Sequence, residues 1–230
     1  MHNIIKNGIL LNKREFSLSF IVFFYLIISF AVISRYVGSD LLPLVQLFFL
    51  FAENYITVSV YYGVRESLWE DALNIPEMFK KGRTFFFRVL AYKVLAGLFI
   101  VIVSAFCLSM LELVKETSLA SAYLFIAFTV IWLSVPIYLF FLTAFTPLII
   151  VAEDISFVKA LKTSVLFLRE RIAGIIQLLL LFLPIWFLVF FLLKGYNESN
   201  PILHIIVFYL VSILEVITVK TFLLFYKTER

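Results

Sequence analysis

The sequence predicts an all-helical protein that crosses a membrane six times. Its 230 residues are 63% hydrophobic and 15% charged, whereas a soluble domain has about 25% charged and about 45–50% apolar residues. With a mean hydropathy of +1.08, the chain has more apolar side chains than one water-soluble core can bury. This composition excludes an ordinary soluble enzyme and a disordered chain, and the single cysteine, Cys107, excludes a disulfide scaffold. We expect one transmembrane domain over residues 1–230.

Six apolar runs account for the predicted crossings, because a bilayer core of about 30 Å requires about 20 apolar residues in a helix. The fourth run is longer than one span but too short for two, so we expect one helix there, kinked near Pro136 and Pro147. Proline removes a backbone hydrogen bond and clashes with the preceding turn, and we expect the same of Pro184 in the fifth span. The predicted spans are Ser17–Ser34, Leu41–Val64, Val94–Leu111, one within Thr117–Ala152, Ile172–Leu193 and Ile202–Tyr226.

The basic residues predict the orientation. Six spans put both termini on one side, and with that side in the cytoplasm only Arg35, Lys115 and Lys194 of the 19 lysines and arginines lie outside. Cytoplasmic loops of membrane proteins carry an excess of Lys and Arg. The sequence therefore predicts cytoplasmic N- and C-termini, and this distribution explains the net charge of +4 without a nucleic-acid partner.

A short internal repeat precedes the first, third and fifth spans. A lysine and, two positions later, a small residue recur in the same register: Lys6 and Gly8, Lys80 and Gly82, and Lys162 and Ser164. Self-similarity at a regular period indicates repeated structural units. We therefore expect three units, about 1–73, 74–153 and 154–230, each an amphipathic helix followed by a membrane hairpin.

The three repeated segments are predicted to be helices that lie in the inner membrane interface. In the third, Val158, Leu161, Val165, Leu168 and Ile172 follow helical spacing on one stripe. Such helices bury an apolar side among acyl chains and present basic residues to anionic headgroups. They could also be simple connectors, or receive a protein partner at the cytoplasmic face. The basic interfacial residues are Lys80, Lys81, Arg83, Lys159, Lys162 and Arg169.

Side-chain caps are expected to start the second and third interfacial helices. Asn74 with Glu77 three residues later resembles a capping box, and Asp154 can cap the third helix. The carboxylates of Glu153 and Asp154 together are interpreted as a helix start.

Polar residues inside the predicted spans are the candidates for a functional site. Glu53 lies 11 residues before Val64 and Glu215 lies 11 residues before Tyr226, so both carboxyls are expected about 16 Å from the inner end of their helices at 1.5 Å per residue. A charge near mid-bilayer costs about 2.5–3.5 kcal/mol on insertion scales. We predict an intramembrane polar site of Glu53, Asn54, Glu215 and Lys220, with Lys220 able to reach the inner surface.

Two interpretations of these residues stay open. The carboxylates could bind a proton, a cation or a polar substrate between the second and sixth spans. Alternatively they could hold helices together through interhelical hydrogen bonds.

No enzymatic chemistry is predicted. The two histidines, His2 and His204, have no partner at metal-ligand spacing, and the sequence has no nucleophile elbow, phosphate loop or dinucleotide fingerprint. We therefore expect a protein that is not an enzyme and that has no metal or other cofactor.

The sequence FTPLIIVAED at 145–154, followed by VKALKTS at 158–164, resembles the six-helix prokaryotic membrane proteins grouped with the membrane domain of the glycerophosphoryl diester phosphodiesterase family. The resemblance implies the same six-helix layout in a prokaryotic cytoplasmic membrane. It implies no catalysis, because the phosphodiesterase activity of fused relatives resides in a separate soluble domain. Among stand-alone members, membrane homeostasis or transport is the suspected role.

Together these features predict a small transport or export component, or an accessory of one. The alternatives are a membrane scaffold that binds lipid or a partner through its interfacial helices, and the permease subunit of an ABC exporter.

Overall fold

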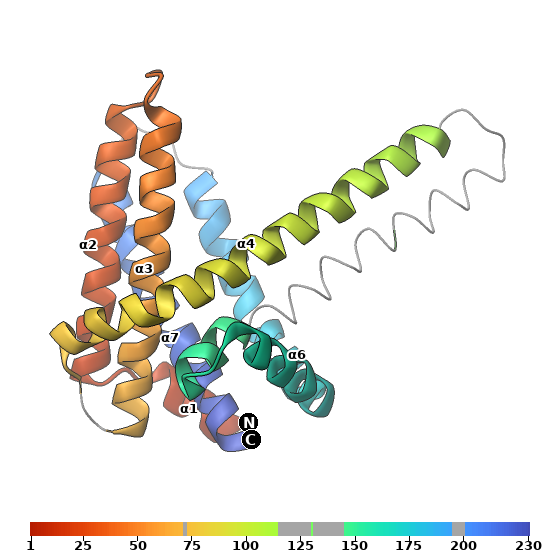
Figure 1. The fold of residues 1–230 in the computed structure, drawn as a ribbon. Coiled ribbons are helices and arrows are strands. Elements are labelled where there is room, and N and C mark those ends of the chain that lie inside the picture. The colour runs from red at the N-terminus through yellow and green to blue at the C-terminus, as the bar shows by residue number, and fades with distance from the viewer. Residues whose placement is uncertain (71–72, 115–129, 131–144, 195–200) are drawn as a thin grey trace.

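The computed structural model describes residues 1–70, 73–114, 130, 145–194 and 201–230, and these residues form helices and short turns without a strand. The residues 145–153 form a helical segment before α6. Figure 1 shows both termini at the same end of the molecule. The helices are α1 (His2–Ile9), α2 (Lys13–Arg35), α3 (Leu42–Trp69), α4 (Ile75–Val114), α6 (Phe157–Lys194) and α7 (Pro201–Glu229).

Five helices are long and apolar enough to cross a membrane, which agrees with a multi-pass membrane protein. They overlap the predicted first, second, third, fifth and sixth spans. The predicted fourth span, with its kink at Pro136, lies mostly outside the described residues, so the count of six stays a prediction. The five candidate spans are Lys13–Arg35, Leu42–Trp69, Ile75–Phe106, Phe157–Val189 and His204–Glu229.

Helices α2, α3 and α7 pack against one another, and α1 lies against α7 near the end that holds both termini. The turn between α2 and α3 contains Gly38 at φ 82°, a conformation that glycine adopts without steric cost. Helix α4 contacts α3 and then leads away from the α2–α3 hairpin (Figure 1). Its first part corresponds to the second predicted interfacial helix, which therefore continues into the third span as one helix.

Helix α6 is interrupted at Arg171, whose angles are φ −122° and ψ 24°. This break lies one residue before the predicted start of the fifth span at Ile172, so it separates the predicted interfacial helix from the span. Pro184 lies inside the helix, and the kink expected there stays a prediction. A break at the predicted interface would leave its backbone groups within reach of water, whereas the hydrocarbon region offers them no partner. Pro147 lies within the helical segment 145–153.

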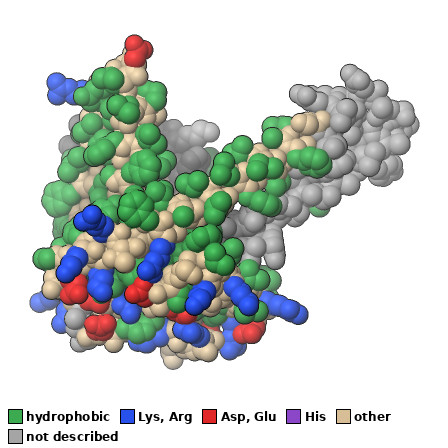
Figure 2. All heavy atoms as spheres, viewed as in Figure 1, with side chains coloured by type: hydrophobic (Ala, Val, Ile, Leu, Met, Phe, Trp, Pro, Cys, Tyr) green, Lys and Arg blue, Asp and Glu red, His purple; other side chains and the backbone are tan. Residues whose placement is uncertain are grey.

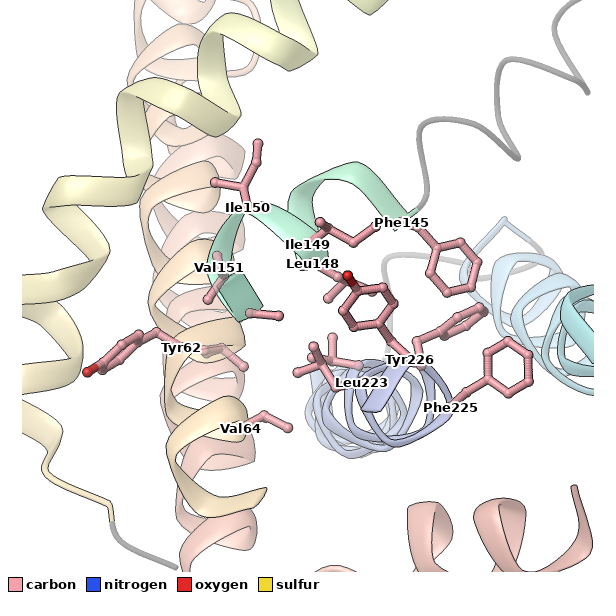
Figure 3. Packing of buried hydrophobic residues seen from close by; sticks show 14 of the residues in the cluster. Tyr62, Val64, Phe145, Leu148, Ile149, Ile150, Val151, Leu223, Phe225 and Tyr226 are labelled. Atoms are coloured by element: carbon pink, nitrogen blue, oxygen red, sulfur yellow. The ribbon is translucent and has the colours of Figure 1, made fainter. Parts of the chain in front are cut away.

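The described helices and the segment 145–152 share a cluster of buried hydrophobic residues. The segment 145–151 lies between α3 and α7 (Figure 3), and its Ile149, Ile150 and Val151 are fully buried in this cluster, which also contains Leu223 of α7. Arg65 of α3 donates a hydrogen bond from Nε to the Ala152 carbonyl at 3.1 Å. This segment therefore joins α3 to α7 through packing and a hydrogen bond. On both helices the contacts lie C-terminal to the predicted site residues Glu53 and Glu215.

The three small residues of the predicted repeat are all buried. A Cβ atom on Gly8 would lie 2.1 Å from Thr221 Oγ1 of α7, and a Cβ on Gly82 would lie 2.0 Å from Ser59 Oγ of α3. Ser164, the third small residue, is fully buried as well. Glycine at the first two positions lets α1 approach α7 and the start of α4 approach α3 closely, and the repeat itself stays a prediction.

We predict that Gly82→Ala destabilises the protein by about 1–3 kcal/mol, because the added methyl group overpacks the contact with Ser59. Thermal unfolding in detergent measures the change. Gly97→Ala is the matched control, since Gly97 also lies within α4 and a Cβ added to it would meet no neighbouring atom within 4 Å. That control should be neutral or stabilising, because alanine is the better helix former. Equal effects of the two substitutions would contradict a close contact at Gly82.

Candidate functional site

A buried ion pair joins the start of α2 to α7. Lys220 Nζ lies 2.7 Å from Glu15 Oε2, and the two side chains are 8% and 1% exposed. Lys220 also donates to the Leu10 carbonyl at 2.6 Å. Two buried charges cost several kcal/mol of desolvation each, and the pair is tolerated only when further hydrogen bonds satisfy both groups.

Polar groups around Glu15 supply these hydrogen bonds. The backbone N–H of Asn12 donates to Glu15 Oε2 at 2.9 Å, and the Glu15 N–H donates to Asn12 Oδ1 at 2.9 Å. These two bonds form a capping box at the start of α2. Ser67 of α3 donates from Oγ to Glu15 Oε1 at 3.2 Å and accepts from Asn12 Nδ2 at 3.2 Å. The network thus connects α2, α3 and α7.

The position of Lys220 corrects one expectation. We predicted that Lys220 belongs to the site of Glu215 and can reach the inner surface, but its side chain is buried and pairs with Glu15. Glu15 lies just before the first predicted span at Ser17 and is not among the predicted site residues. The Asn12-x-x-Glu15 spacing could have revealed it, because it is the same capping-box spacing that was noticed at Asn74 and Glu77.

A second group of charged residues contains Glu53 and Glu215, the two predicted carboxylates. Glu215 of α7 interacts electrostatically with Glu53 of α3 and with Lys93 of α4, and Lys93 interacts with both carboxylates. Glu53 and Lys93 are exposed at the helix surface, and Glu215 is half-buried. The two predicted carboxylates therefore lie within electrostatic range of each other, and Lys93, which is not among the predicted site residues, lies within range of both.

Two tyrosines border this carboxylate cluster, defined as Glu53, Glu215 and Lys93. Tyr25 and Tyr61 each interact electrostatically with both carboxylates. Tyr25 donates its hydroxyl hydrogen to the Phe49 carbonyl at 2.7 Å, which links α2 to α3 beside the cluster.

Asn54 is the predicted site residue with the least satisfied side chain. It is 3% exposed, and neither its amide nitrogen nor its amide oxygen has a hydrogen-bond partner in the part of the chain that the structure describes. Leaving a buried polar group unpaired costs about 1–3 kcal/mol. A buried amide without a partner, next in sequence to Glu53, is what a site for a ligand or water would present.

Glu153 and Asp154 do not start a helix, contrary to our interpretation. Asp154 has a positive φ of 52° and pairs with Arg88 of α4 at 2.6 Å. Glu153 accepts a hydrogen bond from the Tyr226 hydroxyl and pairs with Arg230 at 2.5 Å. The first backbone bond of α6 runs instead from Ala160 to the Ser156 carbonyl, at 2.9 Å. The two carboxylates are drawn to cations elsewhere in the chain, so they connect segments rather than cap a helix.

The second interfacial helix begins as predicted, since the Glu77 N–H donates to Asn74 Oδ1 at 3.3 Å. In the third, Val158, Val165 and Ile172 of the predicted stripe are exposed and Leu168 is buried. Charged side chains gather at the end of the molecule around α1 and the starts of α4 and α6 (Figure 2). The predicted interfacial basic residues are all exposed: Lys80, Lys81, Arg83, Lys159, Lys162 and Arg169.

Comparisons of the chain with protein-family models, with curated proteins and with solved structures find no match. Within the described ranges, no three His, Cys, Asp or Glu side chains are grouped so as to hold a metal ion.

We predict that Lys220→Met destabilises the protein by about 3–5 kcal/mol, because it leaves the Glu15 carboxylate buried without its cation. Combining it with Glu15→Gln should recover part of the loss, since no unpaired charge then remains. Unfolding of both variants in detergent gives the coupling energy.

The exposed pair of Arg171 and Glu229, separated by 3.4 Å, is the control for this prediction. Exposed ion pairs contribute about 0–1 kcal/mol, so Glu229→Gln should change stability by less than Lys220→Met does. Additive effects of Glu15→Gln and Lys220→Met would show that the two groups are not coupled.

Proposed function

We propose that the chain is a non-enzymatic integral membrane protein of a transport or export process, with a site for a proton or another cation at the carboxylate cluster. The observation that carries this proposal is that Glu53, Glu215 and Lys93, from three different helices, lie within electrostatic range of one another. Ionisable residues within spans are costly, and they usually mark ion or substrate pathways.

The charges of the cluster support a cation as its ligand. Two carboxylates beside one lysine leave one negative charge when all three groups are ionised. Lys220 does not neutralise this charge, because it already pairs with Glu15. Asn54, next in sequence to Glu53, has a buried amide without a hydrogen-bond partner in the described residues, and its oxygen is of the kind that coordinates hard cations.

We place the protein, as part of this proposal, in a prokaryotic cytoplasmic membrane with both termini in the cytoplasm. The gathering of charged side chains at the end that holds the termini supports this orientation (Figures 1 and 2), because basic residues accumulate on the cytoplasmic side.

A membrane scaffold is the second candidate. The exposed basic residues of the interfacial helices favour it, since they could bind anionic headgroups or a protein partner. On this alternative, the carboxylates hold helices together and bind no cation.

Proton flux into proteoliposomes tests the proposal. With a pH-sensitive dye inside and a potassium diffusion potential, negative inside, the wild-type protein should acidify the lumen faster than protein-free liposomes do. Glu53→Gln and Glu215→Gln keep hydrogen bonding but remove ionisation, so each should reduce the rate to that of protein-free liposomes. Glu170→Gln, at an exposed position on α6, should leave the rate unchanged.

The same liposomes with a sodium indicator extend the test to a metal cation. Wild-type rates equal to those of protein-free liposomes for both ions would contradict the proposal. If the Gln variants also fail to fold, as judged by gel filtration and thermal unfolding, the carboxylates act as interhelical contacts and the scaffold is favoured.

A further inference from the structure

An apolar cavity of about 390 Å³ has Tyr61 in its wall, a residue that also borders the carboxylate cluster. Ligand pockets have volumes of about 300–1,000 Å³ and are lined mainly by apolar and aromatic side chains with a few polar groups. This cavity has that character, and it is formed by α3, α6, α7 and the segment 145–153. Its lining residues are Tyr61, Leu148, Leu179, Phe182, Leu183, Trp186, Thr218, Val219 and Phe222.

The lining of the cavity continues towards Glu215 on α7. Thr218, Val219 and Phe222 line the cavity, and Glu215 precedes them by three, four and seven residues. Residues at these spacings share one face of a helix. The carboxyl group of Glu215 therefore lies one helical turn beyond the cavity wall, on the face that forms the wall.

Helix α3 repeats this arrangement. Tyr61 lines the cavity and interacts electrostatically with Glu215 and Glu53. Asn54 precedes Tyr61 by seven residues, so it lies two turns away on the same face of α3. Tyr61 thus connects the apolar cavity to a region with two carboxylates and an unpartnered buried amide.

The polar groups inside the cavity are few and mostly engaged. Trp186 donates from Nε1 to Thr218 Oγ1 at 3.3 Å, and Thr218 itself donates to the Leu214 carbonyl at 2.7 Å. The cavity wall is therefore suited to an apolar group rather than to a sugar, phosphate or other strongly hydrated group.

One wall of the cavity reaches the outer surface of the helices. Leu183 lines the cavity and is 51% exposed, and Leu180, one turn before it, is 69% exposed. The helix that carries both is a candidate span. A ligand that partitions into the bilayer could therefore enter from the lipid without passing through water.

We propose that the cavity and the carboxylate cluster together bind a hydrophobic organic cation, with its apolar groups in the cavity and its charge towards Glu215. Charge complementarity selects this class, because the cluster repels an anion and the cavity excludes a hydrated inorganic ion. This inference rests on the proposed function and names the class of substrate that the cation site takes.

Binding of tritiated tetraphenylphosphonium to the protein in nanodiscs tests the inference, with empty nanodiscs as the background. Wild-type protein should bind this cation and should not bind tetraphenylborate, an anion of the same shape. Glu215→Gln removes the charge, and Leu183→Trp fills the cavity from its exposed rim. Each should weaken binding at least about tenfold, a change of about 1.4 kcal/mol.

Leu180→Trp is the matched control for Leu183→Trp, because Leu180 lies on the same helix and does not line the cavity; it should bind like the wild type. Absence of tetraphenylphosphonium binding above empty nanodiscs would overturn the inference, and so would equal binding of the cation and the anion. In both cases proton or sodium flux that depends on Glu53 and Glu215 would leave the proposed function intact. Absence of proton and sodium flux in the wild-type protein would contradict the proposed function itself, whatever the result of the binding experiment.

Discussion

The ion pair between Glu15 and Lys220 determines how the polar parts of this protein are arranged. A lysine buried on α7 requires a compensating anion, and the only place where the fold supplies one to Lys220 within the described residues is the first turn of α2. Since Ser67 of α3 also donates to Glu15, one carboxylate holds three helices together. The relative position of α3 and α7 fixes where Glu53 and Glu215 meet, so the carboxylate cluster depends on the ion pair.

Because Lys220 pairs with Glu15, the two charged residues in the middle of α7, Glu215 and Lys220, have different surroundings. Glu215 and Lys220 are five residues apart, yet they face different partners. Because the lysine is satisfied by Glu15, it does not compensate Glu215, whose neighbours are a second carboxylate and Lys93. Hydrogen bonds within the protein satisfy the ion pair, whereas the carboxylate cluster has two carboxylates for one lysine. Asn54, next in sequence to Glu53, has a buried amide without a hydrogen-bond partner in the described residues. This difference favours a structural role for the ion pair of Glu15 and Lys220, and it is one reason for proposing a ligand at the carboxylate cluster.

Much of this arrangement could be predicted from the sequence, for local reasons. The long apolar helices follow from runs of apolar residues, and the predicted similar level of Glu53 and Glu215 along their helices agrees with their electrostatic interaction. The boundary at Arg171 lies where basic residues end the interfacial segment and the apolar run begins. The pairing of Glu15 with Lys220 could not be predicted, because it joins residues 205 positions apart and depends on how α7 packs against α2.

Other contacts were missed for the same physical reason. Helix α4 is one continuous helix, and its direction past α3 decides which groups Lys93 faces. The partners of Glu153 and Asp154 likewise depend on where α4 and the end of α7 lie. Local sequence patterns do not predict these positions.

The contact between the first and last helices has a consequence for biosynthesis. Helix α1 packs against α7, and Glu15 receives its cation from residue 220. While the chain is being made, Glu15 is synthesised 205 residues before Lys220, so its carboxylate lacks this cation until α7 has been made. Only when α7 has been inserted can Gly8 settle against Thr221 and the carboxylate become buried. The N-terminal segment therefore reaches its final packing only after the last helix has been made. A chain that ends before Lys220 would lack the contacts that hold α1 and Glu15 in the fold.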